Sequence, residues 1–292
     1  PHHQNYLGWH PSHIFLAWNS RASLPLTQNK SQVGSIIITG ISDEELFAQR
    51  FHKTESSINL TNANQFFTVA LFDNMFFRDD IFSRAMIVRF YTTFLDWVIT
   101  DEKVAVINKP KRSLILEWLP ELHELIQKAE STGRWINLLE RHRQLNSVDH
   151  LPIDAACRSD MSIGLGISSA ITEIIAYGAK GIHCDLPNLK DHPFYEWGYN
   201  QVVFTDLASM MTKLKTYMYN KESSNSLGDF GDHMDQIDPF HDGKQPDRVA
   251  QYLSWLIEGF QRDTTREQAI TEANNKYRVM YGHDKVIEKS FS

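Results

Sequence analysis

Residues 66–72 read Phe-Phe-Thr-Val-Ala-Leu-Phe, an unbroken apolar run with the length of one β-strand. Residues 81–99 follow with apolar side chains at helical spacing, which predicts a helix directly after that strand. A strand without polar alternation is buried on both faces. A strand followed by a helix, repeated along the chain, is typical of a parallel sheet covered on both sides.

The same alternation continues to residue 219. Further strands are expected at residues 104–107, 135–139, 161–163, 181–184 and 201–204, and further helices at 116–129, 152–158, 169–177 and 207–219. Crossovers of helical length imply parallel strands. The sequence therefore predicts an α/β fold with a doubly wound, Rossmann-like parallel sheet.

The alternating region divides the chain into three predicted parts. Residues 1–65 form an N-terminal part, with an irregular arm over 1–32, a strand at 33–40, a short helix from Ser42 and a polar linker. Residues 66–220 form the α/β domain, and residues 221–292 a long loop with two closing helices. The chain begins at Pro1 rather than Met, which is compatible with a truncated chain whose N-terminal partner domain is missing.

The composition describes a globular chain that does not coat nucleic acid. Of 292 residues, 42% are hydrophobic, and 36 acidic against 29 basic residues give a net charge of -7. A polyanion-binding protein needs a basic face, so phosphate recognition here must be local. Two cysteines are too few for a disulfide framework and favour a reducing compartment.

Localisation follows from the distribution of apolar residues. No apolar run reaches the roughly 18–20 residues of a spanning helix. The aromatic segment 76–99 carries interspersed arginines, so it either lies at a membrane interface or packs against the sheet. We expect packing, and a cytoplasmic protein with at most peripheral contact with the inner membrane face.

A Gly- and Ser-rich turn joins the strand at 161–163 to the helix at 169–177. Gly164 and Gly166 let the backbone approach a ligand, and Ser168 and Ser169 can cap the helix or donate to phosphate oxygens. The alternative is an ordinary strand-to-helix connection. The turn matches neither the P-loop nor the dinucleotide fingerprint, because Ser169 replaces the third glycine.

Glu173 lies one turn into that helix, where it can accept from a ribose hydroxyl or simply favour the helix dipole. A second candidate anion site follows the strand at 104–107, where Lys109, Lys111 and Arg112 surround Pro110. Three cations so close together can neutralise a phosphate. A solvated basic turn is the alternative.

Residues 160–185 resemble the donor-binding domain of GT-B glycosyltransferases, with an Ala-x-x-Glu-x-x-x-x-Gly helix and a strand ending His-Cys-Asp. The resemblance covers about residues 66–220, and nucleotide-sugar 2-epimerases share the architecture. It implies that the glycines and serines of the turn meet the donor phosphates and that Glu173 holds the ribose.

Two further segments resemble bacterial transferases. Lys109-Pro110 takes the place of the His-Pro found in transferases that use CMP-activated sialic acid or Kdo, so CMP and UDP donors both stay open. Residues 235–244 are similar to the tail of capsule and lipopolysaccharide transferases.

The resemblance predicts a glycosyltransferase that moves a sugar from a CMP- or UDP-linked donor to a bacterial surface polysaccharide or lipid-linked acceptor, with no cofactor and no metal. The alternatives are a nucleotide-sugar 2-epimerase and a non-catalytic nucleotide-sugar-binding module. The candidate catalytic residue is Asp73, which follows the first strand and can serve as a base. An Asp that starts a turn needs no such role.

Two histidine-containing segments are weaker candidates for metal binding. The acidic and histidine residues of 232–242 match no zinc or EF-hand spacing, so a solvated loop is the expected structure. The N-terminal histidines are His2, His3, His10 and His13.

Overall fold

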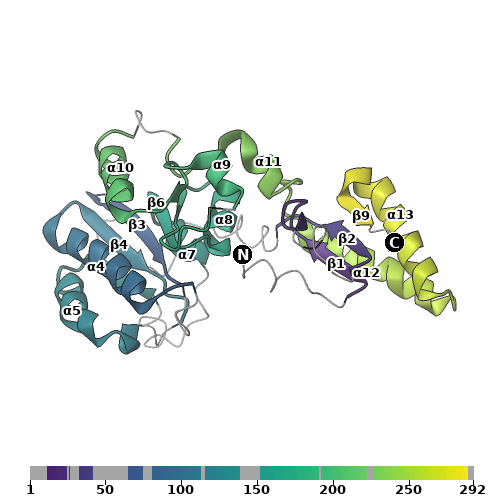
Figure 1. Ribbon diagram of the computed structural model, residues 1–292, viewed down its shortest axis with the longest axis horizontal. Helices are drawn as coiled ribbons and strands as arrows, with labels where there is room; N and C mark the ends of the chain where they lie inside the picture. Colours follow the sequence, from purple (N-terminus) through teal and green to yellow (C-terminus); the bar gives the residue numbers. More distant parts are fainter. Residues whose placement is uncertain are drawn as a thin grey trace. The chain divides into compact units, whose positions relative to one another are not determined.

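The computed structural model describes residues 12–24, 26, 33–41, 65–74, 81–112, 116–138, 152–190, 192–221 and 226–288 (Figure 1). It divides into two compact units. Unit 1 comprises residues 1–48 and 232–292, and unit 2 comprises residues 49–231. The two terminal parts of the chain, which the sequence treats as separate, therefore belong to one unit.

Unit 2 contains a six-stranded sheet in which every neighbouring pair of strands is parallel. Its strands are β3 (Phe67–Phe72), β4 (Val104–Asn108), β5 (Trp135–Asn137), β6 (Met161–Leu165), β7 (Gly181–Cys184) and β8 (Val203–Phe204), in the spatial order β5-β4-β3-β6-β7-β8. The predicted doubly wound parallel sheet is confirmed. The strand order reverses between β3 and β6, which makes this pair the topological switch point.

Helices cover both faces of this sheet. They are α4 (Arg84–Thr100), α5 (His123–Ser131), α7 (Pro152–Ala156), α8 (Ser169–Ala176), α9 (Phe194–Gly198) and α10 (Leu207–Tyr219). Side chains of α4, α5 and α10 share one apolar core with alternate strand residues such as Val69 and Val106. On the opposite face, Gly164 and Gly181 of the sheet adjoin Ile171 of α8.

Helix α4 shows why the aromatic segment packs inward. Ser83 caps its N-terminus by accepting from the amide of Met86 at 3.2 Å. Phe90, Tyr91 and Phe94 are fully buried against the sheet. Packing, rather than exposure at a membrane interface, is confirmed for these aromatic residues. No helix in the described ranges is both long and apolar enough to cross a membrane.

One predicted helix begins later than expected. Residues 116–122 form two short 3-10 turns, Leu116–Trp118 and Pro120–Leu122, and α5 starts only at His123. Pro120 explains the break, because proline lacks an amide hydrogen and disfavours a helical conformation in the residue before it.

Unit 1 contains a three-stranded sheet in the order β1 (Ile14–Ala17), β2 (Ser35–Ile38) and β9 (Val286–Glu288). β1 is parallel to β2, and β9 is antiparallel to it. The prediction of an irregular arm over residues 1–32 is therefore wrong at β1, whose apolar residues pair with β2. The predicted helix from Ser42 and nearly all of the linker lie outside the described residues.

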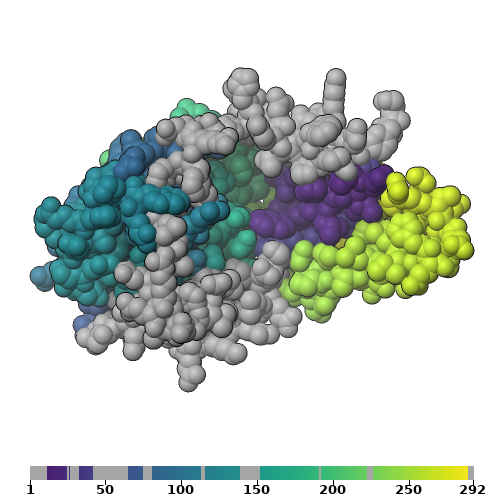
Figure 2. Space-filling model, turned by 90° about the horizontal axis from the view of Figure 1, so that it is seen from below, coloured from purple at the N-terminus to yellow at the C-terminus, as the bar shows by residue number. Residues whose placement is uncertain are grey.

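The described part of unit 1 also contains the α-helices α11 (Met234–Ile237), α12 (Gln245–Gln261) and α13 (Arg266–Tyr281). A reciprocal capping box between Thr265 and Gln268 starts α13. Side chains of α12 and α13 pack on Ile37 and Val286 of the sheet. Figure 2 shows the N-terminal strands, in purple, against the C-terminal segments, in yellow and green.

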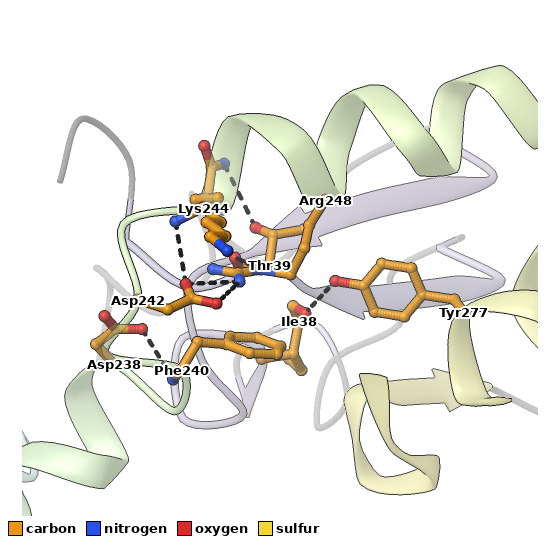
Figure 3. Close-up of polar contacts among 9 residues, drawn as sticks. Ile38, Thr39, Asp238, Phe240, Asp242, Lys244, Arg248 and Tyr277 are labelled. Atoms are coloured by element: carbon orange, nitrogen blue, oxygen red, sulfur yellow. Dashed lines mark hydrogen bonds and ion pairs between the residues drawn. The ribbon is translucent and has the colours of Figure 1, made fainter. Parts of the chain in front are cut away.

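A buried arginine joins the two distant segments of unit 1 (Figure 3). Arg248 of α12 is 1% exposed, and its Nε donates to the carbonyl oxygen of Thr39 at 2.8 Å. Its Nη1 donates to both carboxylate oxygens of Asp242, at 2.7 and 2.8 Å. The guanidinium carbon lies 3.7 Å from the centre of the Phe240 ring. Segment 235–244 therefore has a structural role in the fold.

We expect Arg248→Ala to destabilise unit 1 by about 3 kcal/mol, because it opens a cavity and removes the partner of a buried carbonyl. The control is Arg262→Ala, whose exposed ion pair with Glu272 should contribute less than about 1 kcal/mol. Hydrogen exchange at the β2 amides measures the difference. Equal protection in both variants would contradict the assigned role.

Candidate functional site

The candidate site lies at the carboxyl edge of the unit 2 sheet, beside the switch point. In open parallel sheets, ligands bind where the strand order reverses, next to the helix N-termini. Here β3 ends at Phe72, β4 ends at Asn108, and β6 leads into the N-terminus of α8. The predicted site residues of the chain lie on the segments that follow these three strands, except Gly164, which lies within β6.

The basic turn after β4 is held against the end of β3. The Lys109 amide donates to the Leu71 carbonyl oxygen at 2.9 Å and so extends the strand ladder. The Lys111 amide donates to Asp73 Oδ1 at 2.6 Å, and Lys111 Nζ donates to Asn74 Oδ1 at 3.2 Å. The side chains of Lys111 and Arg112 are exposed. The structure thus brings Asp73 and Lys111 together and leaves cationic side chains at the edge.

Asp73 is buried, with 7% of its surface exposed. Its Oδ2 accepts a hydrogen bond from the Tyr91 hydroxyl at 2.7 Å, so both carboxylate oxygens have donors. Burial raises the pKa of Asp73 to about 6, although the hydrogen bonds from Lys111 and Tyr91 lower it. The role of Asp73 as a catalytic base stays a prediction. Through its hydrogen bond with the Lys111 amide, Asp73 holds the basic turn against the end of β3.

The N-terminus of α8 is the second part of the site. Ser168 is its N-cap residue, but its side chain makes no capping hydrogen bond. The backbone amide of Ser168 donates instead to Nδ1 of His183 at 3.1 Å. Ser169 begins the helix with an exposed side chain, and Glu173 lies half-buried one turn further on. Their proposed contacts with phosphate and ribose remain predictions.

Gly164, near the end of β6, and Gly166, in the turn before α8, both have a packing explanation. A Cβ at Gly164 would lie 2.6 Å from Cγ1 of Ile171, so this glycine lets α8 pack closely on β6. Gly166 has a φ of +74°, and a Cβ there would lie 2.4 Å from the Phe82 ring. Packing against these side chains therefore explains both glycines, even if no ligand binds nearby. That either one also approaches a ligand remains a prediction.

Two buried polar residues at the end of β7 are absent from the predicted site. Burial lowers the pKa of His183 to about 3, which keeps the ring neutral, and the ring stacks on Phe194. Asp185 Oδ2 accepts from the Leu189 amide at 2.7 Å and from the Tyr195 hydroxyl at 2.5 Å. The sequence contains a pattern that could have identified them, because polar residues in a His-Cys-Asp run end an otherwise apolar strand.

No group of three or more metal-binding side chains occurs in the described ranges. The expectation of a solvated loop over residues 232–242 is wrong at α11, whose last residue Ile237 is buried with Asp238. Asp235 Oδ1 of this helix pairs with His241 Nε2 at 2.9 Å.

A polar hollow of about 540 Å³ lies at the opposite, amino edge of the same sheet. Asp160 there accepts from Lys221 Nζ at 2.7 Å and from the Thr68 amide at 2.9 Å. We place the candidate site at the carboxyl edge, because the helix N-terminus and the basic turn lie there.

Comparison with known proteins shows the fold. No protein-family model and no curated protein sequence matches the chain. Solved structures do match, among them a Listeria monocytogenes protein assigned as a UDP-N-acetylglucosamine 2-epimerase, with 12% identity and a TM-score of 0.50 over 87% of this chain and 61% of that one. S. aureus MnaA with UDP matches with 11% identity and a TM-score of 0.54, over 85% and 60% of the two chains.

Another UDP-N-acetylglucosamine 2-epimerase matches with 14% identity and a TM-score of 0.51, over 87% of this chain and 58% of that one. The chain thus spans 58–61% of the length of these proteins. The predicted Rossmann-like, GT-B-type fold is confirmed. At such low identity the likeness establishes the fold alone.

We expect Asp73→Asn to stabilise the protein at neutral pH. A carboxyl whose pKa is raised from 3.8 to about 6 opposes folding once it ionises. Its contribution to stability is complete below pH 3.8 and is lost as the pH rises through 6. The variant should therefore be more stable than the wild type by up to about 3 kcal/mol above pH 7, with little gain near pH 4.

Urea unfolding at pH 4 and pH 7.5 measures this difference. The control is Asp96→Asn, which changes an exposed carboxylate on the same helix that carries Tyr91. A gain for Asp73→Asn that is equal at both pH values would contradict the assigned burial.

Proposed function

We propose that unit 2 binds a nucleotide sugar at the carboxyl edge of its sheet, with the phosphates between the basic turn and the N-terminus of α8. The observation that carries this proposal is the position of these two elements on either side of the switch point. Lys111 is tied to the end of β3 through Asp73 and Asn74, and α8 follows β6, the strand beside β3. A helix N-terminus attracts anions, and exposed cations add to that attraction.

The charge distribution supports a local anion site. The whole chain carries a net charge of -7, which repels anions at long range. Screening limits that repulsion to about 8–10 Å at physiological salt, so nearby cations decide the local potential. Lys109, Lys111 and Arg112 concentrate positive charge in one turn. Glu173 is the residue we assign to the ribose hydroxyls.

The solved structures with this fold support 2-epimerisation of a UDP-linked sugar more than glycosyl transfer, because the neighbours described above carry the epimerase name. Epimerisation at a carbon needs a group that removes a proton and one that returns it. Glycosyl transfer to a surface polysaccharide or lipid-linked acceptor rests on the sequence resemblance alone. We therefore propose epimerisation as the first activity to test.

Binding without catalysis is the second candidate function. It is favoured by the burial and hydrogen bonding of the side chains that could otherwise transfer a proton. Asp73 is buried with both oxygens engaged. His183 is fully buried, neutral and hydrogen-bonded through Nδ1. Asp185 is also fully buried. Within the described ranges, these groups at the carboxyl edge are therefore held as structural groups rather than presented to a substrate.

We expect UDP-N-acetylglucosamine to bind to the wild-type chain in calorimetry, and the double variant Lys109→Ala/Lys111→Ala to bind it at least tenfold more weakly. Each charge-assisted hydrogen bond contributes about 1.5–3 kcal/mol. Affinity for uridine alone should change little, because it has no phosphate. The matched control is Lys213→Ala/Lys215→Ala, which removes two exposed lysines from α10. No binding of UDP- or CMP-linked sugars by the wild type would refute the proposal.

Glu173→Ala should weaken UDP and uridine equally, by about 1.5–3 kcal/mol, because the ribose is common to both ligands. Proton NMR of the wild-type chain with UDP-N-acetylglucosamine identifies the reaction by following the sugar. Formation of the C2 epimer supports the epimerase, release of UDP in the presence of acceptor glycan supports the transferase, and unchanged bound ligand supports binding alone. A loss for UDP only would remove Glu173 from the ribose.

A further inference from the structure

Asp73, Tyr91 and Asn108 form a buried polar group behind the basic turn. Asp73 follows β3, Asn108 ends β4, and Tyr91 reaches them from α4. Tyr91 and Asn108 are fully buried. The Asn108 amide lies close enough to the Tyr91 hydroxyl to affect its pKa, yet neither its oxygen nor its nitrogen has a hydrogen-bond partner in the described structure. An unpartnered buried amide is costly, which calls for an explanation.

We propose that Asp73 is a positioning residue, which fixes the basic turn through the Lys111 amide and takes up a proton when an anion binds to that turn. This inference rests on the proposed function, since the anion is the phosphate of the nucleotide sugar. In the unbound state the negative charge of Asp73 lies directly behind Lys109 and Lys111. Removing that charge strengthens the attraction of the turn for an anion.

The hydrogen-bond geometry shows where the proton goes. The Lys111 amide can only donate, so Oδ1 of Asp73 must stay an acceptor. A proton taken from solvent therefore binds to Oδ2, which now accepts from Tyr91. The Tyr91 oxygen then accepts this new O–H, and the hydroxyl hydrogen of Tyr91 rotates away from Oδ2. One proton enters, and no covalent bond between heavy atoms changes.

The surroundings of Asp73 are consistent with titration near neutral pH. Among the described residues, the groups that act on its pKa are Lys111, Tyr91 and Lys109, and all of them lower it against a larger effect of burial. Asp73 is buried but keeps 7% of its residue surface exposed.

Calorimetry with UDP-N-acetylglucosamine at pH 5.5 and pH 8 tests the inference, because the charge of its diphosphate does not change over this range. We expect the wild type to bind about tenfold more tightly at pH 5.5. Asp73→Asn should bind equally at both pH values and as tightly as the wild type at pH 5.5, since it is neutral but keeps an oxygen for the Lys111 amide. Asp73→Ala should bind weakly at both.

Tyr91→Phe tests the proton path if Asp73→Ala does not fold. Loss of the Tyr91 hydrogen bond should raise the pH midpoint of binding, because that bond lowers the pKa of Asp73. An unmoved midpoint would overturn the path. Wild-type binding that is equal at both pH values overturns the inference and leaves the proposed function standing. Absence of binding at both pH values overturns the two together.

Discussion

The pairing of β3 with β6 is the contact on which unit 2 depends. Val69 lies opposite Met161, and Leu71 lies opposite Ile163, so the first and fourth strands of the unit share the centre of the sheet. Strands before β6 continue to one side and strands after it to the other. The segments that follow β3 and β6 therefore leave the same carboxyl edge of the sheet and continue in opposite directions.

That edge separates buried polar groups from exposed charged ones. Asp73 and Asn108 lie on the same strand faces as Val69 and Val106, which places them above the core under α4. Lys109 and Lys111, one and three residues beyond the end of β4, lie close to the surface and at the surface. The anchor of the turn, Asp73, follows β3, and the cationic side chains follow the neighbouring strand β4, so two adjacent strands supply the two parts.

The sequence predicts unit 2 well because its information is local. A strand such as 66–72 is recognised by its unbroken apolar run, and a helix such as 81–99 by the spacing of its apolar residues. The alternation of the two predicts the doubly wound topology. The pairing of β2 with β9 has no such signal, because a three-residue strand pairs across about 250 residues of chain. The same holds for Asp73, whose burial depends on Tyr91 from the next helix. The sequence identifies Gly164 and Gly166 as unusual positions. It cannot show whether the missing side chain makes room for a ligand or for a neighbouring side chain, which here is Ile171 or Phe82.

The bond between Ser168 and His183 bears on how an anion would be held. Helix N-termini bind anions through amides that no internal group satisfies. Here the N-cap amide already donates to a neutral imidazole, which leaves the amides of the first helical turn for an anion. With that contribution reduced, exposed lysine and arginine side chains must supply more of the attraction, and such attraction is screened by salt. In the proposed site, anion recognition therefore depends mainly on the charge of the basic turn, and the negative charge of the buried Asp73 carboxylate behind the turn subtracts from it.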